Sequence, residues 1–168
     1  HLAVRIAPNG EILVRGAAML GYLGETETAP QEIATGDLGH LDAAGFLHVT
    51  GRKKNVQITA FGRNFSPEWI ESEAEHCPAI ARVVIFGDGL AQNVALIEPR
   101  PGAEAQLAEQ IVTLNKRLPD YARVHRWFVP EQPLSASGLL TPNGRPRRER
   151  ILQTFATRIQ QLAQGEPA

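Results

Sequence analysis

The fold of most of this chain is decided by Arg82-Val83-Val84-Ile85-Phe86-Gly87-Asp88-Gly89-Leu90-Ala91-Gln92-Asn93-Val94-Ala95-Leu96-Ile97. Two apolar runs, 82–86 and 93–97, stand on either side of Gly87-Asp88-Gly89. Short apolar runs bounded by a glycine-containing turn are typical of neighbouring strands. The stretch therefore predicts two strands joined around Gly87-Asp88-Gly89.

Helix signals lie on both sides of these strands. Upstream, Ser66-Pro67-Glu68 combines a capping residue, a proline suited to a first turn and an acid that favours the helix dipole. This pattern predicts a helix from Ser66 to about His76. Downstream, apolar residues recur at helical spacing between Glu104 and Leu118, which predicts an amphipathic helix; they are Leu107, Ile111, Leu114 and Leu118.

The remainder of this segment adds one strand and one helix. Arg126-Trp127-Phe128-Val129 predicts a third strand, and a stretch rich in Ser, Gly, Pro and Asn follows it. A terminal helix then presents an apolar face made of Ile151, Phe155, Ile159 and Leu162. Together these elements predict an α+β fold, a small three-stranded sheet with helices.

The beginning of the chain predicts β-hairpins instead. The first hairpin pairs residues 3–7 with residues 11–15 around Pro8-Asn9-Gly10, and the second spans residues 39–50 with its turn at 42–45. Because these strands hold few apolar residues, we interpret them as the end of a larger β-rich domain.

Composition narrows the class of protein. Of the 168 residues, 43% are hydrophobic and 21% are charged, which is typical of a globular domain. The net charge of −1 predicts neither nucleic acid nor an anionic membrane as a partner. The chain begins at His1 without a basic-then-apolar leader, and its single cysteine, Cys77, fits a reducing compartment. We therefore expect a soluble, cytoplasmic piece of a longer protein without a transmembrane segment.

Charge divides the chain into two parts. Residues 1–51 carry two basic and six acidic side chains, a balance of −4, whereas residues 52–168 carry 15 basic and 12 acidic ones, a balance of +3. The sign changes at Gly51-Arg52-Lys53-Lys54, and we expect a boundary there.

Three loops contain residues that suit a ligand. Thr35-Gly36-Asp37-Leu38-Gly39 places a carboxylate at the mouth of a hairpin, where it could accept the hydroxyls of a ribose, although an ordinary turn explains the same residues. Gly51-Arg52-Lys53-Lys54-Asn55 is cationic, and taken alone it is better explained as a solvated linker. The loop containing Phe61-Gly62-Arg63 ends on a helix N-terminus, a place that suits an anion or a close-packed extended ligand. It does not match the phosphate-loop pattern G-x-x-x-x-G-K-[ST].

The turn-rich segment 138–148 carries the arginines Arg145, Arg147 and Arg148. Arginine can hold phosphate or carboxylate groups through two parallel hydrogen bonds. Nucleic-acid binding is the weaker alternative, because no aromatic platform or basic face accompanies the cluster. The five histidines show no metal spacing, so no metal site is predicted, and Cys77 is interpreted as a packing residue.

The order of the motifs is more specific than any one of them. They are Gly10-Glu11-Ile12-Leu13-Val14-Arg15-Gly16, Thr35-Gly36-Asp37, Gly51-Arg52-Lys53-Lys54, the Gly62 loop with Trp69-Ile70-Glu71, and Leu140-Thr141-Pro142-Asn143-Gly144. In this order they resemble the C-terminal third of the AMP-forming acyl-adenylate superfamily, which includes acyl-CoA synthetases, luciferases and the adenylation domains of peptide synthetases. Leu139-Leu140-Thr141-Pro142 followed by Arg147-Arg148 is most similar to the fatty-acyl-CoA synthetase branch.

The resemblance implies a two-step reaction of a carboxylic acid with ATP and then CoA. The first step gives an acyl-adenylate and pyrophosphate, and in the second step the CoA thiol displaces AMP. It also implies that residues 1–51 end a large adenylation domain, that residues 52–55 form a hinge and that residues 56–168 form a mobile C-terminal lid domain. In such enzymes the aspartate matching Asp37 holds the ribose hydroxyls, and the arginine matching Arg52 contacts the nucleotide.

Further roles follow from the same resemblance. Lys54 matches the residue about which the lid rotates. Phe61-Gly62-Arg63 matches the loop that then faces the active site, with its glycine lining the pantetheine passage. Arg145 stands where the family usually has a lysine that bridges the carboxylate and the α-phosphate.

The implied cofactors are ATP, AMP, CoA and Mg²⁺, bound mainly by an upstream adenylation domain of the same protein. The 168 residues would then be inactive alone. The substrates of the longer enzyme would be CoA and a carboxylic acid, which the resemblance indicates to be a fatty acid. Two alternatives stay open. One is a non-catalytic acyl- or nucleotide-binding relative that lost adenylation when Arg145 replaced lysine, and the other is an enzyme that loads a carrier protein in place of CoA.

Overall fold

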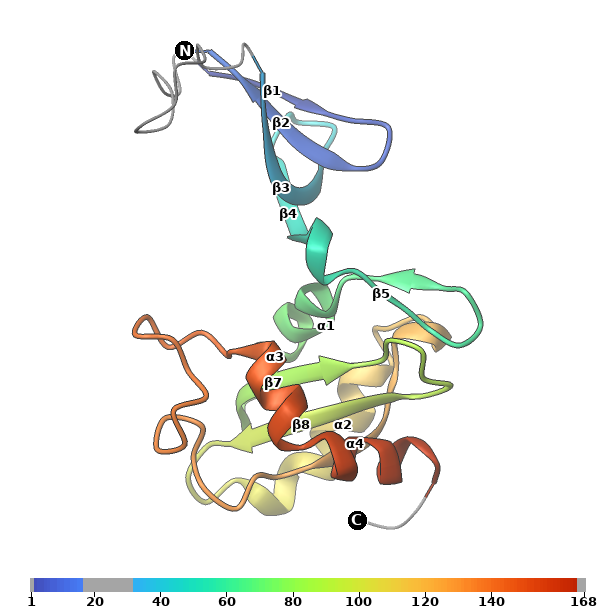
Figure 1. Ribbon diagram of the computed structural model, residues 1–168, viewed down its shortest axis with the longest axis vertical. Helices are drawn as coiled ribbons and strands as arrows, with labels where there is room; N and C mark the ends of the chain where they lie inside the picture. The colour runs from blue at the N-terminus through green and yellow to red at the C-terminus, as the bar shows by residue number, and fades with distance from the viewer. Residues whose placement is uncertain (1, 17–31, 166–168) are drawn as a thin grey trace. The chain divides into compact units, whose positions relative to one another are not determined.

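The computed structural model describes residues 2–16 and 32–165. The chain forms two compact units, His1–Val56 and Gln57–Ala168. Within the described residues the first unit contains a four-stranded sheet, and the second contains one two-stranded and one three-stranded sheet (Figure 1). Short 3₁₀ turns occur at Lys53–Asn55, Glu104–Gln106 and Asp120–Ala122.

The three-stranded sheet of the second unit consists of β7 (Ile80–Phe86), β8 (Asn93–Pro99) and β9 (Val124–Phe128), in the order β7-β8-β9. β7 and β8 are antiparallel, and β9 lies parallel to β8. The α+β prediction is confirmed, and the strands differ from the predicted ranges only at their ends. β7 and β9 both begin two residues earlier than predicted.

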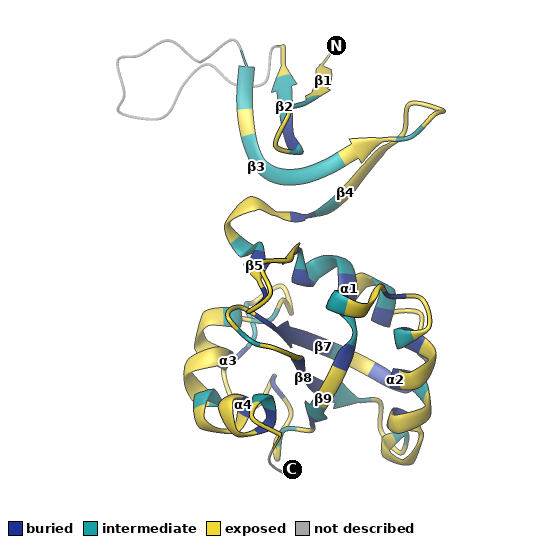
Figure 2. Ribbon diagram, turned by 90° about the vertical axis from the view of Figure 1, so that its right-hand side faces the viewer, coloured by how far each residue is buried: buried dark blue, intermediate teal, exposed yellow. Residues whose placement is uncertain are grey.

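Helices cover both faces of this sheet. They are α1 (Pro67–Ala74), α2 (Leu107–Asn115), α3 (Arg148–Thr154) and α4 (Ala156–Ala163). Figure 2 shows α1 and α2 on one side of the sheet and α3 and α4 on the other. Successive strand residues therefore enter different cores, which explains the uninterrupted apolar runs in the sequence. Val83, Ile85, Ala95 and Ile97 pack with α1 and α2, whereas Val84, Phe86, Val94 and Leu96 pack with α3 and α4.

Two predicted helices differ from the observed ones. The helix predicted over 104–118 is wrong in length, because the α-helical part runs only from Leu107 to Asn115. Pro119 disfavours helical geometry at the residue before it, so the segment cannot extend to Leu118. The helix predicted from Ser66 to about His76 begins as expected at Pro67 and ends two residues early, at Ala74.

The single terminal helix was also a wrong prediction, since α3 and α4 are separate helices. Phe155 leaves the helical region between them, with φ −111° and ψ 18°. Thr154 Oγ1 donates a hydrogen bond to the Arg150 carbonyl at 2.8 Å, and such back-bonding bends helices. The break leaves Phe155 against Phe128, with ring centroids 5.4 Å apart. Both helices keep the predicted apolar face toward the sheet.

The first unit is an antiparallel sheet of β1 (Ala3–Ile6), β2 (Glu11–Arg15), β3 (Glu32–Leu41) and β4 (Leu47–Arg52), in that order. Both predicted hairpins are present. Its one buried apolar side chain among the described residues is Ile12. That this sheet ends a larger domain stays a prediction.

The segment Thr35-Gly36-Asp37-Leu38-Gly39 lies inside β3, so its placement at the mouth of a hairpin was wrong. The pairing of β3 shifts register against both neighbours here, which is the signature of a β-bulge. Gly36 has φ +73°, a conformation that glycine adopts at little cost. The glycines that suggested a turn therefore serve an irregular stretch within a strand.

Packing around Gly87 predicts a strong effect of a single methyl group. A Cβ at this position would lie 2.7 Å from Cζ of the buried Phe65 and would also overlap Asn93 Oδ1. Asn93 cannot turn away freely, because its Nδ2 donates to the carbonyls of Tyr121 at 2.9 Å and Arg123 at 3.1 Å.

We expect Gly87→Ala to lower the free energy of unfolding by about 1–3 kcal/mol, the usual cost of overpacking a core. Urea denaturation of the 168-residue chain measures this effect. Gln92→Ala, an exposed change in the same turn, is the control and should stay within about 0.5 kcal/mol of the original chain. Equal midpoints for the two variants would show that Gly87 is not constrained by packing.

Candidate functional site

The two residues expected to hold a nucleotide lie side by side in the first unit. Asp37 on β3 and Arg52 on β4 are Cα partners in the register of the two strands. Arg52 Nε lies 2.7 Å from Asp37 Oδ1, and Arg52 Nη1 donates to the Thr35 carbonyl at 3.2 Å. The Asp37 side chain is 29% exposed, so the paired carboxylate is fixed in position yet open to solvent on one side.

The bulge of β3 determines how Asp37 is presented. The Thr35 hydroxyl donates to the Ile12 carbonyl at 2.8 Å and accepts the Asp37 amide at 3.1 Å. The Gly36 amide donates to Glu11 Oε1 at 3.3 Å. The backbone before Asp37 is thus held to β2 by side chains instead of regular ladder hydrogen bonds, and this is the local reason for its orientation.

A second pair in the first unit was missed by the sequence analysis. Lys53 Nζ lies 2.8 Å from Oε2 of Glu11, whose other carboxylate oxygen holds the bulge. The hydrogen bond from Lys53 holds the pKa of Glu11 below its usual range, against the opposing effect of partial burial. Glu11 and Lys53 are 42 positions apart, so neither periodicity nor a motif pointed to their contact.

Lys54 differs from its neighbour. It is exposed on the 3₁₀ turn Lys53–Asn55, and the described residues provide no ion-pair partner for it. It lines a shallow depression of the first unit together with Gly36, Arg52 and Lys53. Lys53 therefore fastens this turn to the sheet, whereas the ammonium of Lys54 extends into solvent.

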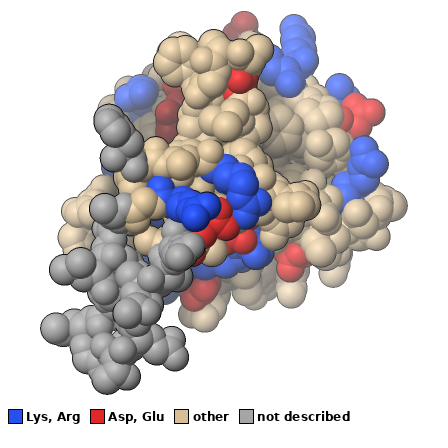
Figure 3. Space-filling view, turned by 90° about the horizontal axis from the view of Figure 1, so that it is seen from above, with Lys and Arg blue, Asp and Glu red and all other residues tan. Residues whose placement is uncertain are grey.

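Ion pairs offset much of the positive charge in the first unit. Besides the pairs of Arg52 and Lys53, Arg5 Nη2 lies 2.6 Å from Glu32 Oε2. On the face seen in Figure 3, basic side chains lie beside acidic ones, and no continuous basic area is visible. This mixed face does not resemble the basic surfaces that nucleic-acid-binding proteins use.

In the second unit, Phe61-Gly62-Arg63 forms the tip of a hairpin. Its strands are β5 (Gln57–Ile58) and β6 (Asn64–Phe65), which sequence analysis left within a loop. The Gly62 amide donates to the Thr59 carbonyl at 2.9 Å, and Gly62 has φ +73°. Phe61 is 75% exposed, so the tip presents an unusually open aromatic ring.

The hairpin tip is anchored at two places. The turn after β7 holds its base, because the Gly89 amide donates to the Ile58 carbonyl at 2.8 Å and the Ala60 amide to the Leu90 carbonyl at 3.0 Å. The Arg63 guanidinium lies over the ring of Tyr121, 5.0 Å from its centroid. A cation–π contact of this kind leaves most of the guanidinium hydrogen-bond donors available to a ligand.

Arg145 lies in a tight turn before α3. Thr141 and Arg145 close this turn: the Thr141 amide donates to the Arg145 carbonyl at 2.8 Å, and the Arg145 amide donates to Thr141 Oγ1 at 3.1 Å. The exposed Arg145 side chain has no ion-pair partner among the described residues, and it borders a groove that also contains Arg82 and Arg100. The turn thus fixes the backbone by two hydrogen bonds and leaves the cationic side chain exposed.

Figure 1 shows the hairpin tip and the Arg145 segment on opposite sides of the second unit: the tip beyond β5 on the right, and the segment before α3 on the left. The structure therefore pairs Asp37 with Arg52 in the first unit, and Lys54 lines a depression beside Arg52. The structure keeps Arg145 and the hairpin tip apart in the second.

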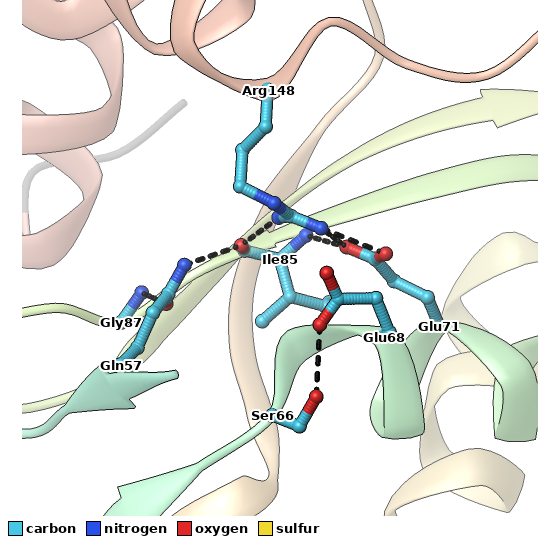
Figure 4. A network of polar contacts seen from close by, with 7 residues as sticks. All are labelled: Gln57, Ser66, Glu68, Glu71, Ile85, Gly87 and Arg148. Atoms are coloured by element: carbon cyan, nitrogen blue, oxygen red, sulfur yellow. Dashed lines mark hydrogen bonds and ion pairs between the residues drawn. The ribbon is translucent and has the colours of Figure 1, made fainter. Parts of the chain in front are cut away.

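The other missed feature is a network around the backbone of Ile85 (Figure 4). Arg148 Nη2 lies 2.7 and 2.8 Å from the two carboxylate oxygens of Glu71, and Nη1 donates to the Ile85 carbonyl at 2.7 Å. Burial raises the pKa of Glu71, and Arg148 opposes this effect. We name this set the Ile85 network; it comprises Gln57, Glu71, Ile85, Gly87 and Arg148.

Arg148 thus binds a carboxylate of its own chain, which is one of the two kinds of group that the sequence suggested for the arginine cluster. No pattern in the sequence marked the start of this helix, so the signal is visible only in the fold. Arg148 is the first residue of a helix, where a positive charge opposes the helix dipole. A cation in this position indicates a partner elsewhere in the fold.

The remaining candidate groups are readily placed. Cys77 is free and buried, and burial raises the pKa of its thiol, which agrees with a packing role. Within residues 2–16 and 32–165, no three His, Cys, Asp or Glu side chains gather as metal ligands would. The helices of that same part of the chain are all too short or too polar to span a bilayer.

Solved structures with the same fold include adenylation domains and a CoA synthetase. The A-PCP didomain of a carboxylic acid reductase from Segniliparus rugosus, in complex with AMP, matches with a TM-score of 0.78 at 16% identity, over 96% of this chain and 27% of that one. The o-succinylbenzoate CoA synthetase MenE from Bacillus subtilis matches with a TM-score of 0.68 at 23% identity, over 89% of this chain and 33% of that one. The fold is therefore that of adenylate-forming enzymes.

Residues 55–166 match the AMP-binding enzyme C-terminal domain, and the chain belongs to this family. Its relatives include the long-chain fatty-acid–CoA ligase FadD15 of Mycobacterium tuberculosis, 39% identical over 60% of this chain and 18% of the ligase. A 3-[(3aS,4S,7aS)-7a-methyl-1,5-dioxo-octahydro-1H-inden-4-yl]propanoyl:CoA ligase of Rhodococcus jostii is 32% identical over 84% of this chain and 30% of the ligase. The chain thus spans less than a third of the length of these relatives.

The Glu11–Lys53 pair predicts a measurable titration. We expect carbon-13 NMR of the Glu11 carboxyl to show a pKa below the usual range, and Lys53→Gln to raise it. Lys54→Gln is the matched control and should leave it unchanged. Because the pKa of Glu11 is lower in the folded chain, the pair stabilises the fold fully above the pKa of an unfolded glutamate. This stabilisation is lost as the pH falls through the pKa of Glu11 in the folded chain. An identical titration in both lysine variants would contradict the pairing.

Proposed function

We propose that these residues act as the C-terminal part of an AMP-forming acyl-CoA synthetase. The longer enzyme joins a carboxylic acid to ATP, releases pyrophosphate, and then transfers the acyl group from AMP to CoA. One observation carries the proposal: in a chain of this family, Asp37 and Arg52 are paired on neighbouring strands, with the carboxylate open to solvent. The fatty-acid–CoA ligases among its relatives favour a fatty acid as the substrate.

The proposed nucleotide contacts use charges that are already oriented. The Asp37 carboxylate can accept hydrogen bonds from both hydroxyls of a ribose, and Arg52 orients this carboxylate through the ion pair and supplies donors of its own. Because β3 and β4 fix both side chains before a ligand arrives, binding requires little further ordering. We assign Mg²⁺ and most contacts to the ATP phosphates to an upstream domain of the longer protein.

Two loops on opposite sides of the second unit fit a domain that serves two steps in turn. Arg145 would face the reacting carboxylate and α-phosphate during adenylation, and rotation about residues 52–55 would then present the Phe61-Gly62-Arg63 tip during thioester formation. Each loop is tightly hydrogen-bonded, so either could be presented as a preformed surface that excludes water.

The free Cys77 thiol is compatible with the cytoplasmic location that we propose.

Arg145 provides the test of adenylation in the full-length protein that carries this chain. We expect ATP–pyrophosphate exchange, measured without CoA over a panel of fatty and aryl acids, and we expect Arg145→Ala to lower its rate roughly 10²–10³-fold, as losing a preorganised charge does. Arg145→Lys should retain exchange, and Arg150→Ala, an exposed arginine on α3, should leave it unchanged.

Two results would favour other functions. Exchange that appears only after Arg145→Lys would indicate a non-catalytic acyl- or nucleotide-binding relative. Exchange without CoA thioester formation, but with transfer to a phosphopantetheine carrier, would indicate the carrier-loading enzyme. The absence of exchange from every variant would contradict the proposal that this protein adenylates an acid.

The hinge provides a separate test. We expect Lys54→Pro in the full-length protein to reduce CoA-dependent thioester formation far more than pyrophosphate exchange, because proline fixes φ and opposes rotation at this residue. Lys54→Ala removes the same ammonium and keeps the rotation, so it is the matched control. Equal losses of both half-reactions in Lys54→Pro would overturn the assignment of Lys54 as the hinge.

A further inference from the structure

The Ile85 network provides hydrogen-bond partners for backbone groups at the open edge of the three-stranded sheet. Among the strands of residues 2–16 and 32–165, β7 pairs with β8 alone, so Ile85 has a backbone N–H and C=O on the side without a neighbouring strand. Its amide donates to Glu71 Oε1 at 2.8 Å, and its carbonyl accepts from Arg148 Nη1 at 2.7 Å and from Gln57 Nε2 at 3.3 Å. Side chains here take the place of a fourth strand.

Arg148 makes the strongest contacts of the network. Its guanidinium meets the Glu71 carboxylate and the Ile85 carbonyl together, and both ionic side chains are about four-fifths buried. A guanidinium can serve two acceptors in this way because its donors form a rigid fork, which a lysine ammonium lacks. The helix dipole alone would disfavour a cation at this position, so tertiary contacts must hold it there.

The network joins two segments with different proposed roles. Arg148 follows Arg145 by three positions, and Gln57 follows Lys54 by three positions. Both side chains donate to the same carbonyl, that of Ile85. Gln57 is fixed in addition by the Gly87 amide, which donates to its Oε1 at 2.7 Å. The base of the Arg145 turn and the beginning of the second unit are therefore attached to one point of the sheet.

We propose that Glu71 and Arg148 are positioning residues for Arg145. Through the Ile85 network they hold the turn at 141–145 in register with the start of the second unit, so that the turn moves with the unit as one body. The inference rests on the proposed function, because it assigns the two residues to the adenylation step. We assign neither residue a contact with substrate; they act through the backbone that carries Arg145.

Amide hydrogen exchange on the 168-residue chain tests the inference directly. We expect Arg148→Lys and Glu71→Gln to accelerate exchange at the amides of Thr141, Gly144 and Arg147 by roughly tenfold to a hundredfold, the change expected from losing one charged hydrogen bond. Amides of β8 should change much less, because the effect is an opening of the turn and not of the whole unit.

The chain offers a matched control on the same helix. Glu73 of α1 is two positions from Glu71, and its pair with Arg117 is long, at 3.8 Å. Glu73→Gln makes the same chemical change and should leave exchange in the turn unaltered. An increase of equal size in the turn and in β8 would overturn the inference and leave the network a purely stabilising role; an unchanged turn would overturn it as well.

Activity in the full-length protein adds an independent readout. We expect Arg148→Lys to lower kcat of pyrophosphate exchange with little change in the KM for ATP, since Asp37 and Arg52 are untouched. If the unmodified protein catalysed no pyrophosphate exchange, the proposed function would be contradicted. The amide hydrogen-exchange result would still decide whether the Ile85 network holds the turn. If amide hydrogen exchange in the turn became faster while kcat of pyrophosphate exchange stayed the same, the assignment of the network to the adenylation step would be overturned.

Discussion

A narrow sheet that is buried on both faces must find hydrogen-bond partners for its open edges, and this constraint governs the second unit. Side chains meet it on both edges of the sheet. At β7 the Ile85 network serves the backbone of Ile85, and at β9 the Asn115 amide exchanges two hydrogen bonds of 2.8 Å with the backbone of Val124. Glu71, Asn115 and Arg148 belong to α1, α2 and α3. Their hydrogen bonds to the edge strands therefore also fix how these helices pack on the sheet.

The first unit solves a different problem with similar means. Its described part buries one apolar side chain, so hydrophobic packing contributes little to its order. Cross-strand polar contacts, from Glu11 to Lys53 and from Asp37 to Arg52, hold the strands near the bulge instead. The same charges that fix the backbone also leave a carboxylate in a defined place, which links the local structure to the proposed nucleotide site.

Local signals in the sequence were sufficient for most elements and for the order of the motifs. Apolar runs predicted β7 and β8, and Ser66-Pro67 predicted the start of α1, because these patterns act over a few residues. The break at Phe155 was not predictable, since a continuous apolar face is equally compatible with one helix or two. Contacts such as Glu71 with Arg148, 77 positions apart, depend on tertiary packing that no spacing rule describes.

The candidate site shows the same division between motif and contact. Asp37 and Arg52 were singled out as types of residue in a pattern, but the bulge that presents Asp37 depends on Thr35 and Glu11 reaching between strands. Arg148 is the clearest case, because a basic cluster reads as a ligand site in sequence, while in the fold its most buried member is used internally. Within one arginine-rich segment, Arg148 therefore contacts Glu71 and the Ile85 carbonyl, whereas the side chain of Arg145 is exposed and has no ion-pair partner among the described residues.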